Sequence, residues 1–185
     1  AEESILVQLA ALVADSRQQK KADEQSLDRH PKLIFVQGAA GTGKTVLLSH
    51  LFYRIATEIG IQGDTYSEDE DYPELPQTAN GRLSSYILVN HKEQVHVYNQ
   101  IATKLGLQKE SGEVVMLPSQ FINRFSLRNE HGRGIPDQPQ GLADIVLIDE
   151  AHLLMTQGNQ GYSGKNQLYD ILRRARVVIA VFDHN

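Results

Sequence analysis

The sequence predicts an α/β fold in which a parallel sheet carries helices on both faces. Short apolar runs alternate along the chain with segments whose apolar residues recur at helical spacing. A glycine-rich loop joins the first apolar run directly to a helix, and residues 145–148 are apolar at every position, as in a strand buried on both sides. Because strands that alternate with helices pair in parallel, these observations favour a single covered sheet.

Composition narrows the class of protein. A chain of 185 residues with 41% hydrophobic content is long enough to bury one core, so we expect a single domain. The formal net charge of -5 lacks the basic balance typical of nucleic-acid-binding proteins, although a groove can be basic locally. The absence of cysteine excludes disulfides and thiolate metal sites. No apolar run has the length of a membrane span, and we expect a soluble, cytoplasmic protein without a membrane partner.

Residues 1–30 are expected to form an amphipathic helix followed by a linker. Apolar residues within positions 1–13 share one helical face, and residues 15–30 are polar up to Pro31. The basic residues of the linker favour a solvated surface, and a contact with RNA is the alternative. These basic residues are Arg17, Lys20 and Lys21.

The glycine-rich loop follows a short apolar strand at residues 33–36 and fits the pattern G-x-x-x-x-G-K-T. Glycines let backbone N–H groups approach a triphosphate, the lysine reaches its β- and γ-phosphates, and the threonine hydroxyl can ligate Mg²⁺. We therefore predict a phosphate-binding loop (P-loop) for ATP, with Mg²⁺ as the second cofactor. Its residues are Gly38, Ala39, Ala40, Gly41, Thr42, Gly43, Lys44 and Thr45.

The middle of the chain is expected to contain an insertion, two strands and two helices. Residues from about 60 to 84 are rich in carboxylates and contain prolines and glycines, so we expect an exposed acidic insertion. Metal binding is the alternative there, but the spacing lacks the pattern of a calcium loop. Strands are predicted at 85–89 and 114–117, helices at 93–105 and from Pro118 onward, and a loop at 128–141.

A second motif, Asp-Glu-Ala-His at residues 149–152, directly follows the apolar strand 145–148. Because ligands bind at the carboxyl ends of parallel strands, this motif should lie opposite the glycine-rich loop. Asp149 would then hold Mg²⁺ together with Thr45, and Glu150 would orient and deprotonate an attacking water. A polar strand end without a catalytic duty is the alternative. A helix around residues 168–172 and a strand at 177–182 are predicted to follow.

The segments QGAAGTGKT and LIDEAHLL resemble motifs I and II of superfamily 1 helicases. The segment SGKNQLYDILRRARVVIAVFD is similar to a bacterial helicase-like ATPase family related to the Schlafen helicase domain. The resemblance covers about residues 32–183 and implies that residues 31–185 form a first RecA-like domain of the P-loop NTPase type. Asp183 stands where motif III has an acidic residue, and the glutamine expected soon after it is missing. We therefore expect a truncation before a second RecA-like domain.

The resemblance also implies roles for individual residues. Lys44 and Glu150 would be catalytic, and His152 would couple the γ-phosphate to the neighbouring strand end. For His152, an ordinary polar helix residue is the alternative. Single-stranded DNA or RNA would contact residues that follow the second and third strands, for which ordinary loop and helix-start positions are the alternative. These residues are Asn90, His91, Lys92, Ser119, Gln120 and Phe121.

Two functions follow from these patterns. The first is Mg²⁺-dependent ATP hydrolysis by the motor domain of a nucleic-acid helicase or translocase, whose second RecA-like domain would supply an arginine finger. This piece alone is then expected to bind ATP weakly and hydrolyse it slowly. The alternative is a signalling or defence ATPase that acts as a conformational switch without nucleic acid, which the acidic charge balance favours. For the late arginines, at a helix end, we expect a structural role. They are Arg173, Arg174 and Arg176.

Overall fold

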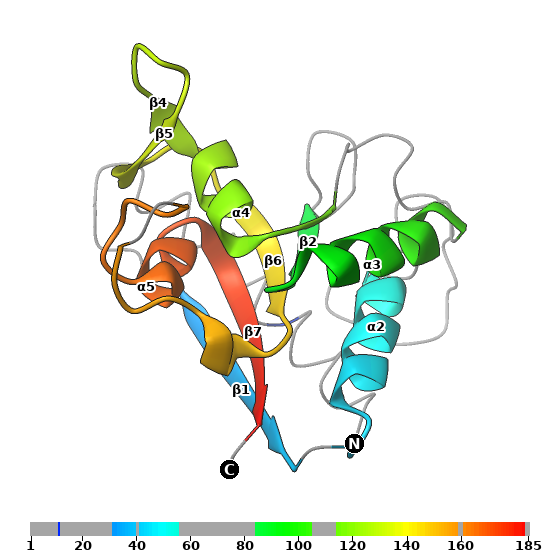
Figure 1. The fold of residues 1–185 in the computed structure, drawn as a ribbon. Coiled ribbons are helices and arrows are strands. Elements are labelled where there is room, and N and C mark those ends of the chain that lie inside the picture. Colours follow the sequence, from blue (N-terminus) through cyan, green and yellow to red (C-terminus); the bar gives the residue numbers. More distant parts are fainter. Residues whose placement is uncertain are drawn as a thin grey trace.

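A computed structural model describes residues 11, 31–39, 41–55, 84–104, 114–158 and 161–183. These residues form a five-stranded sheet in the order β1-β7-β6-β2-β3, in which every neighbouring pair is parallel (Figure 1). The strands are β1 (Lys32–Gly38), β2 (Ser85–Leu88), β3 (Val115–Met116), β6 (Ala143–Ile148) and β7 (Ala175–Asp183). The predicted α/β fold with a parallel sheet is confirmed.

Helices cover both faces of this sheet (Figure 1). One face packs against α2 (Lys44–Arg54) and α3 (Lys92–Lys104). The other face packs against α4 (Pro118–Arg124) and α5 (Gln167–Leu172). This arrangement leaves the ends of the strands as the part of the sheet that the helices do not cover, which is where ligands bind in such folds.

The central strands contribute side chains to both cores. Successive residues of a strand point to opposite faces, so alternate side chains enter different cores. In β6, Ile145 and Leu147 pack with α2 and α3, whereas Val146 and Ile148 pack with α4 and α5. Every residue of β6 is buried, which explains why its residues 145–148 are a continuous apolar run in the sequence.

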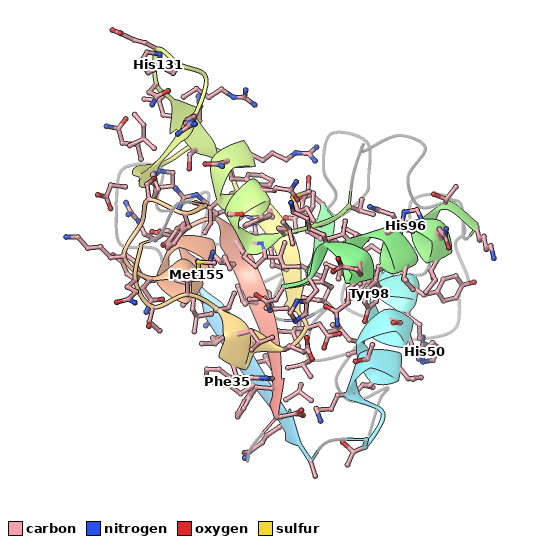
Figure 2. The ribbon with its side chains drawn as sticks, in the orientation of Figure 1. Phe35, His50, His96, Tyr98, His131 and Met155 are labelled. Atoms are coloured by element: carbon pink, nitrogen blue, oxygen red, sulfur yellow. The ribbon has the colours of Figure 1, made fainter. Side chains whose placement is uncertain are left out.

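A second, two-stranded antiparallel sheet is formed by β4 (Ser126–Arg128) and β5 (Gly134–Pro139). The prediction of a loop over 128–141 is therefore wrong for Arg128 and for residues 134–139, which are half of this segment. Its prolines and polar residues are typical of loops, but a short, largely exposed strand pair with an irregular register tolerates them. His131 lies in the turn at the tip of this hairpin (Figure 2).

Several predictions concern residues outside the described ranges. One is the amphipathic helix and linker at 1–30, of which the structure describes Ala11 alone, as a helical residue. Another is the acidic insertion at about 60–84, of which the structure describes Ser84 alone. Ala40 of the glycine-rich loop also falls outside. Among the described residues, every helix is too short or too polar to serve as a membrane span.

Candidate functional site

The carboxyl ends of neighbouring strands bring the two predicted motifs to one edge of the sheet. In the parallel register, Gly38 at the end of β1 lies beside Asp183 at the end of β7. Ile148 at the end of β6 lies beside Ala180 on one side and Leu88 on the other. The segments that follow β1, β2 and β6 therefore emerge at the same edge.

A cleft of about 380 Å³ opens at this edge. Its volume falls in the lower part of the range of small-molecule sites. Residues of both motifs and of the end of β7 line it. They are Gly41, Gly43, Lys44, Thr45, Asp149, Glu150, His152, Val181, Phe182 and Asp183.

The shape of the glycine-rich loop depends on its glycines. Gly41 and Gly43 have φ values of 76° and 82°, in the left-handed region that other residues rarely adopt. A Cβ atom on Gly38 would lie 2.8 Å from the Thr42 hydroxyl oxygen, which is too close for an ordinary contact. Helix α2 begins directly after Gly43, so the N–H groups of its first turn lie beside the cleft. Backbone donors and the positive end of a helix together favour an anion.

Lys44 holds its ammonium within the glycine-rich loop. Its Nζ donates to the main-chain carbonyls of Gly38 and Ala39, at 2.9 and 2.6 Å. It also forms an ion pair with the Asp183 carboxylate at the end of β7. An anionic ligand in the cleft would therefore bind an ammonium group that already has protein partners. It would either bind Lys44 together with these partners or displace one of them.

Thr45 and Asp149 meet in the cleft although they are 104 positions apart. Thr45 Oγ1 donates to Asp149 Oδ2 at 3.2 Å. Asp149 is only 2% exposed, and its Oδ1 accepts the N–H of Glu150 at 3.1 Å. A hydroxyl and a carboxylate are oxygen ligands that suit Mg²⁺, which usually takes one or two protein groups and completes its shell with phosphates and water. Within the described ranges, no three His, Cys, Asp or Glu side chains gather as a metal site of their own.

Glu150 has a left-handed backbone conformation, with φ 51° and ψ 49°. In the part of the chain that the structure describes, no other residue except glycine has a positive φ. This conformation costs about 1–2 kcal/mol and is most often found at functional sites. The Glu150 carboxylate accepts a hydrogen bond from Gln94 Nε2 at 3.3 Å and lies 3.9 Å from His91 Nε2.

His152 lies in a short 3-10 helix, η2 (Ala151–Leu153), directly after the acidic pair. The N–H of Asp183 points to His152 Nδ1 at 3.5 Å, the outer limit of a hydrogen bond. The side chain thus connects the second motif to the end of β7, the neighbouring strand on this side.

Tyr98 of α3 supplies a second donor to Asp149. Its hydroxyl donates to Asp149 Oδ2 at 3.0 Å. Burial raises the pKa of the Tyr98 hydroxyl, and the negative charge of Asp149 raises it further. The hydroxyl therefore stays protonated and acts as a donor. Figure 2 shows Tyr98 where α3 passes beside α2.

The model of the family described as Schlafen group 3, DNA/RNA helicase domain, matches residues 31–185. The chain belongs to this family. It is also 31% identical over 157 residues to the uncharacterized protein YPL245W of Saccharomyces cerevisiae, which covers 84% of the chain. The chain spans 29% of the length of that relative.

The match confirms the helicase-like family that the sequence motifs indicated. The restriction to bacteria is not confirmed, and the similar protein is from a yeast. The identity of this Schlafen group 3 domain as a RecA-like P-loop NTPase stays a prediction.

In this Schlafen group 3 domain, the residues expected to bind nucleic acid after β2 differ in accessibility. Asn90 is half-buried, and its Nδ2 donates to the carbonyls of Asp149 and Glu150, both at 3.1 Å. His91 and Lys92 are exposed at the start of α3. The amide of Asn90 thus contacts the acidic motif, whereas its two neighbours face solvent.

The residues expected to bind nucleic acid after β3 lie at the start of α4. Ser119 is half-buried and Gln120 is exposed. Gln120 Oε1 accepts the N–H of Leu117 at 2.9 Å and so caps the helix. Phe121 is 0% exposed and packs edge-on against the Tyr86 ring, so its side chain belongs to the core.

The late arginines have the structural contacts that were expected of them. Arg174 is 0% exposed, and its guanidinium donates to the carbonyls of Phe125, Asp170 and Pro136 and to the Ser126 hydroxyl. The structural role was expected from the position at a helix end, but direct hydrogen bonds to α5 and to the segment around the β4–β5 hairpin explain the burial of Arg174. The other two arginines also contact the protein. Arg173 Nη2 donates to the Asp137 carbonyl at 3.0 Å, and Arg176 Nε forms an ion pair with Asp144 Oδ1 at 3.2 Å.

Sequence reasoning did not identify Gln94 or Tyr98 as part of the site. The Tyr98 ring packs in the core, as helical spacing within the predicted helix 93–105 allows, but its hydroxyl contacts Asp149. The available signal was the spacing of Gln94 and Tyr98, since polar groups four residues apart share one side of a helix.

Proposed function

We propose that this domain binds ATP with Mg²⁺ and hydrolyses the nucleotide as the motor domain of a nucleic-acid helicase or translocase. The observation that carries the proposal is the 3.2 Å contact between Thr45 Oγ1 and Asp149 Oδ2. This contact joins the two motifs within a cleft that Lys44 and Glu150 also line. A RecA-like P-loop NTPase is the fold identity that goes with such a site.

Each residue has its own task in this reaction. Backbone N–H groups of the loop and of the first turn of α2 bind phosphate oxygens, and Lys44 offsets charge on the γ-phosphate. Thr45 and Asp149 would hold Mg²⁺, which when bound neutralises further phosphate charge. Glu150 orients the attacking water and accepts its proton. His152, next to the end of β7, would couple the γ-phosphate to that strand.

The family relationship and the exposed start of α3 support a single strand of DNA or RNA as the partner. His91 and Lys92 are exposed there, and Lys92 offers the positive charge that a phosphate backbone requires. A second RecA-like domain of the same protein is proposed to close the ATP cleft and supply an arginine finger. Ser119 and Gln120 belong to the same proposed strand path.

The second candidate is a signalling or defence ATPase that changes conformation without a strand to move along. The formal net charge of -5 favours it, because proteins that bind nucleic acid by electrostatics are usually basic. The two candidates share the ATP site and differ only in what stimulates turnover.

The test is steady-state ATP turnover of the complete protein with and without single-stranded DNA or RNA, with Glu150→Gln as the blank. Strong stimulation by a strand supports the motor and identifies its nucleic acid. Turnover that ignores both strands supports the switch. Turnover at the level of the blank under every condition contradicts ATP hydrolysis altogether.

The phosphate-binding loop is tested separately by calorimetry. Lys44→Ala should abolish ATP binding, because the ammonium is the main charged group that the loop offers to the phosphates. Unchanged affinity in this variant would contradict the assignment of the loop.

A further inference from the structure

Three polar side chains, two on α3 and one just before it, contact the acidic motif. Gln94 and Tyr98 are four residues apart on one side of α3, and Asn90 stands four residues before Gln94, just ahead of the helix; we name these three residues the α3 row. Asn90 Nδ2 donates to the main-chain carbonyls of Asp149 and Glu150. Gln94 Nε2 donates to the Glu150 carboxylate, and the Tyr98 hydroxyl donates to the Asp149 carboxylate. Each acidic side chain therefore has its own donor on α3.

The α3 row reaches the motif because β2 and β6 are neighbours in the sheet. Leu88 of β2 pairs with Ile148 of β6, so both strands end at the same level. The N–H of Asp149 donates to the Leu88 carbonyl at 2.9 Å and extends this pairing beyond the strands. Beyond this level, β2 is followed by α3, and β6 is followed by the acidic motif.

Packing alone does not account for these contacts. The Tyr98 ring lies in the core between α3 and the sheet, and a phenylalanine ring would fill the same space. The hydroxyl adds a donor to Asp149 Oδ2, the same oxygen that accepts from Thr45. Gln94 similarly donates to the side chain of Glu150, whose backbone is held in the left-handed region. These donors restrict the rotamers of the carboxylates that the proposed chemistry needs.

The other end of the α3 row lies at the exposed start of the helix. His91 and Lys92 are exposed in that turn, and His91 Nε2 is 3.9 Å from the Glu150 carboxylate. A ligand that moves this turn changes the position of Gln94 relative to Glu150, because Gln94 lies in the same helix as Lys92 and donates directly to the Glu150 carboxylate, which belongs to a different segment.

We propose that Gln94 and Tyr98 are positioning residues of the ATPase site, and that the α3 row makes ATP turnover depend on a strand bound at the start of α3. The inference rests on the proposed function, since it assumes both ATP hydrolysis and a nucleic-acid strand. It extends that function by naming the side chains that link the two ligands.

The experiment compares two isosteric substitutions in the complete protein. Gln94→Met keeps the length of the side chain and removes its donor. Gln100→Met makes the same change at an exposed position of α3, where the side chain contacts His96 and not the acidic motif. For each variant, ATP turnover is measured with and without single-stranded DNA or RNA, together with KM for ATP, strand affinity and the melting temperature.

Gln94→Met should lower the strand-stimulated kcat about tenfold, with KM for ATP and strand affinity within about twofold of the wild type. Gln100→Met should behave as the wild type. Tyr98→Phe should raise the Mg²⁺ concentration for half-maximal turnover several-fold, because Asp149 loses a donor that orients it.

Different results overturn different claims. Wild-type protein without strand-stimulated turnover removes the motor function, and the inference with it. Stimulated wild type with equal responses in the two methionine variants overturns the inference alone. The inference is also overturned if Gln94→Met raises KM or lowers the melting temperature and leaves kcat unchanged. An unchanged Mg²⁺ dependence in Tyr98→Phe removes Tyr98 as a positioning residue.

Discussion

Lys44 and Asp183 form an ion pair between the start of α2 and the end of β7. The pairing of Gly38 with Asp183 in adjacent strands brings the carboxylate beside the glycine-rich loop. Their side chains are 14% and 27% exposed, so water screens the pair only in part. A triphosphate that binds Lys44 must compete with this carboxylate and also lies near its negative charge.

Replacing Asp183 by Asn should therefore strengthen ATP binding. The substitution removes the competing charge and keeps the size of the side chain. We expect a roughly fivefold lower Kd, equivalent to about 1 kcal/mol for a partly exposed ion pair. Calorimetric titration with a non-hydrolysable ATP analogue measures the effect. Asp137→Asn, on the exposed hairpin strand β5, changes net charge equally and should leave Kd unchanged. Equal or weaker binding in Asp183→Asn would show that this carboxylate does not oppose the ligand.

Glycine at position 150 should give a more stable protein than alanine at the same position. Both substitutions remove the carboxylate and its contacts, so they differ mainly in the cost of the left-handed backbone. We expect Glu150→Gly to exceed Glu150→Ala by about 0.5–1 kcal/mol in unfolding free energy, with ATP turnover lost in both. Urea denaturation followed by circular dichroism measures the difference. A more stable alanine variant would contradict the backbone strain inferred at Glu150.

The parts of the fold that the sequence predicted correctly have local causes. A continuous apolar run at residues 145–148 marks β6 because both of its faces are covered. The glycine-rich loop is recognisable because positive φ at Gly41 and Gly43 and the close approach at Gly38 require glycine. The edge of the sheet where Lys44 and Asp149 meet follows from the parallel alternation of strands and helices.

The features of the fold and of the candidate site that the sequence did not predict depend on contacts between distant segments. Pro136 lies in a strand, its carbonyl accepts a hydrogen bond from the buried guanidinium of Arg174, and nothing near the proline in sequence indicates that partner. Gln94 and Tyr98 reach Glu150 and Asp149 only because β2 pairs with β6. Periodicity places a tyrosine ring in a core but does not say where its hydroxyl points.

Arg174 should be one of the side chains most important for stability. Its buried guanidinium donates to the carbonyls of Asp170 and Pro136, which would lose this donor in Arg174→Met. We expect a loss of about 2–4 kcal/mol of unfolding free energy, since unsatisfied buried acceptors are costly. Chemical denaturation measures it. Arg128→Met, an exposed arginine at the end of β4, should change stability by less than about 0.5 kcal/mol. Similar losses in both variants would contradict the structural role of Arg174.

Asn90 and Lys92 should have separable effects although they are two residues apart. Asn90→Ala leaves the carbonyls of Asp149 and Glu150 without its donors, so ATP turnover should fall about tenfold with little change in strand affinity. Lys92→Ala removes an exposed charge, so strand affinity should fall and its dependence on log salt concentration should decrease by about one. Fluorescence anisotropy of a labelled single strand over a range of salt, with an ATP turnover assay on the same samples, separates the two effects. Weaker strand binding with normal turnover in Asn90→Ala would instead assign Asn90 to the nucleic-acid contact that the helicase resemblance implied.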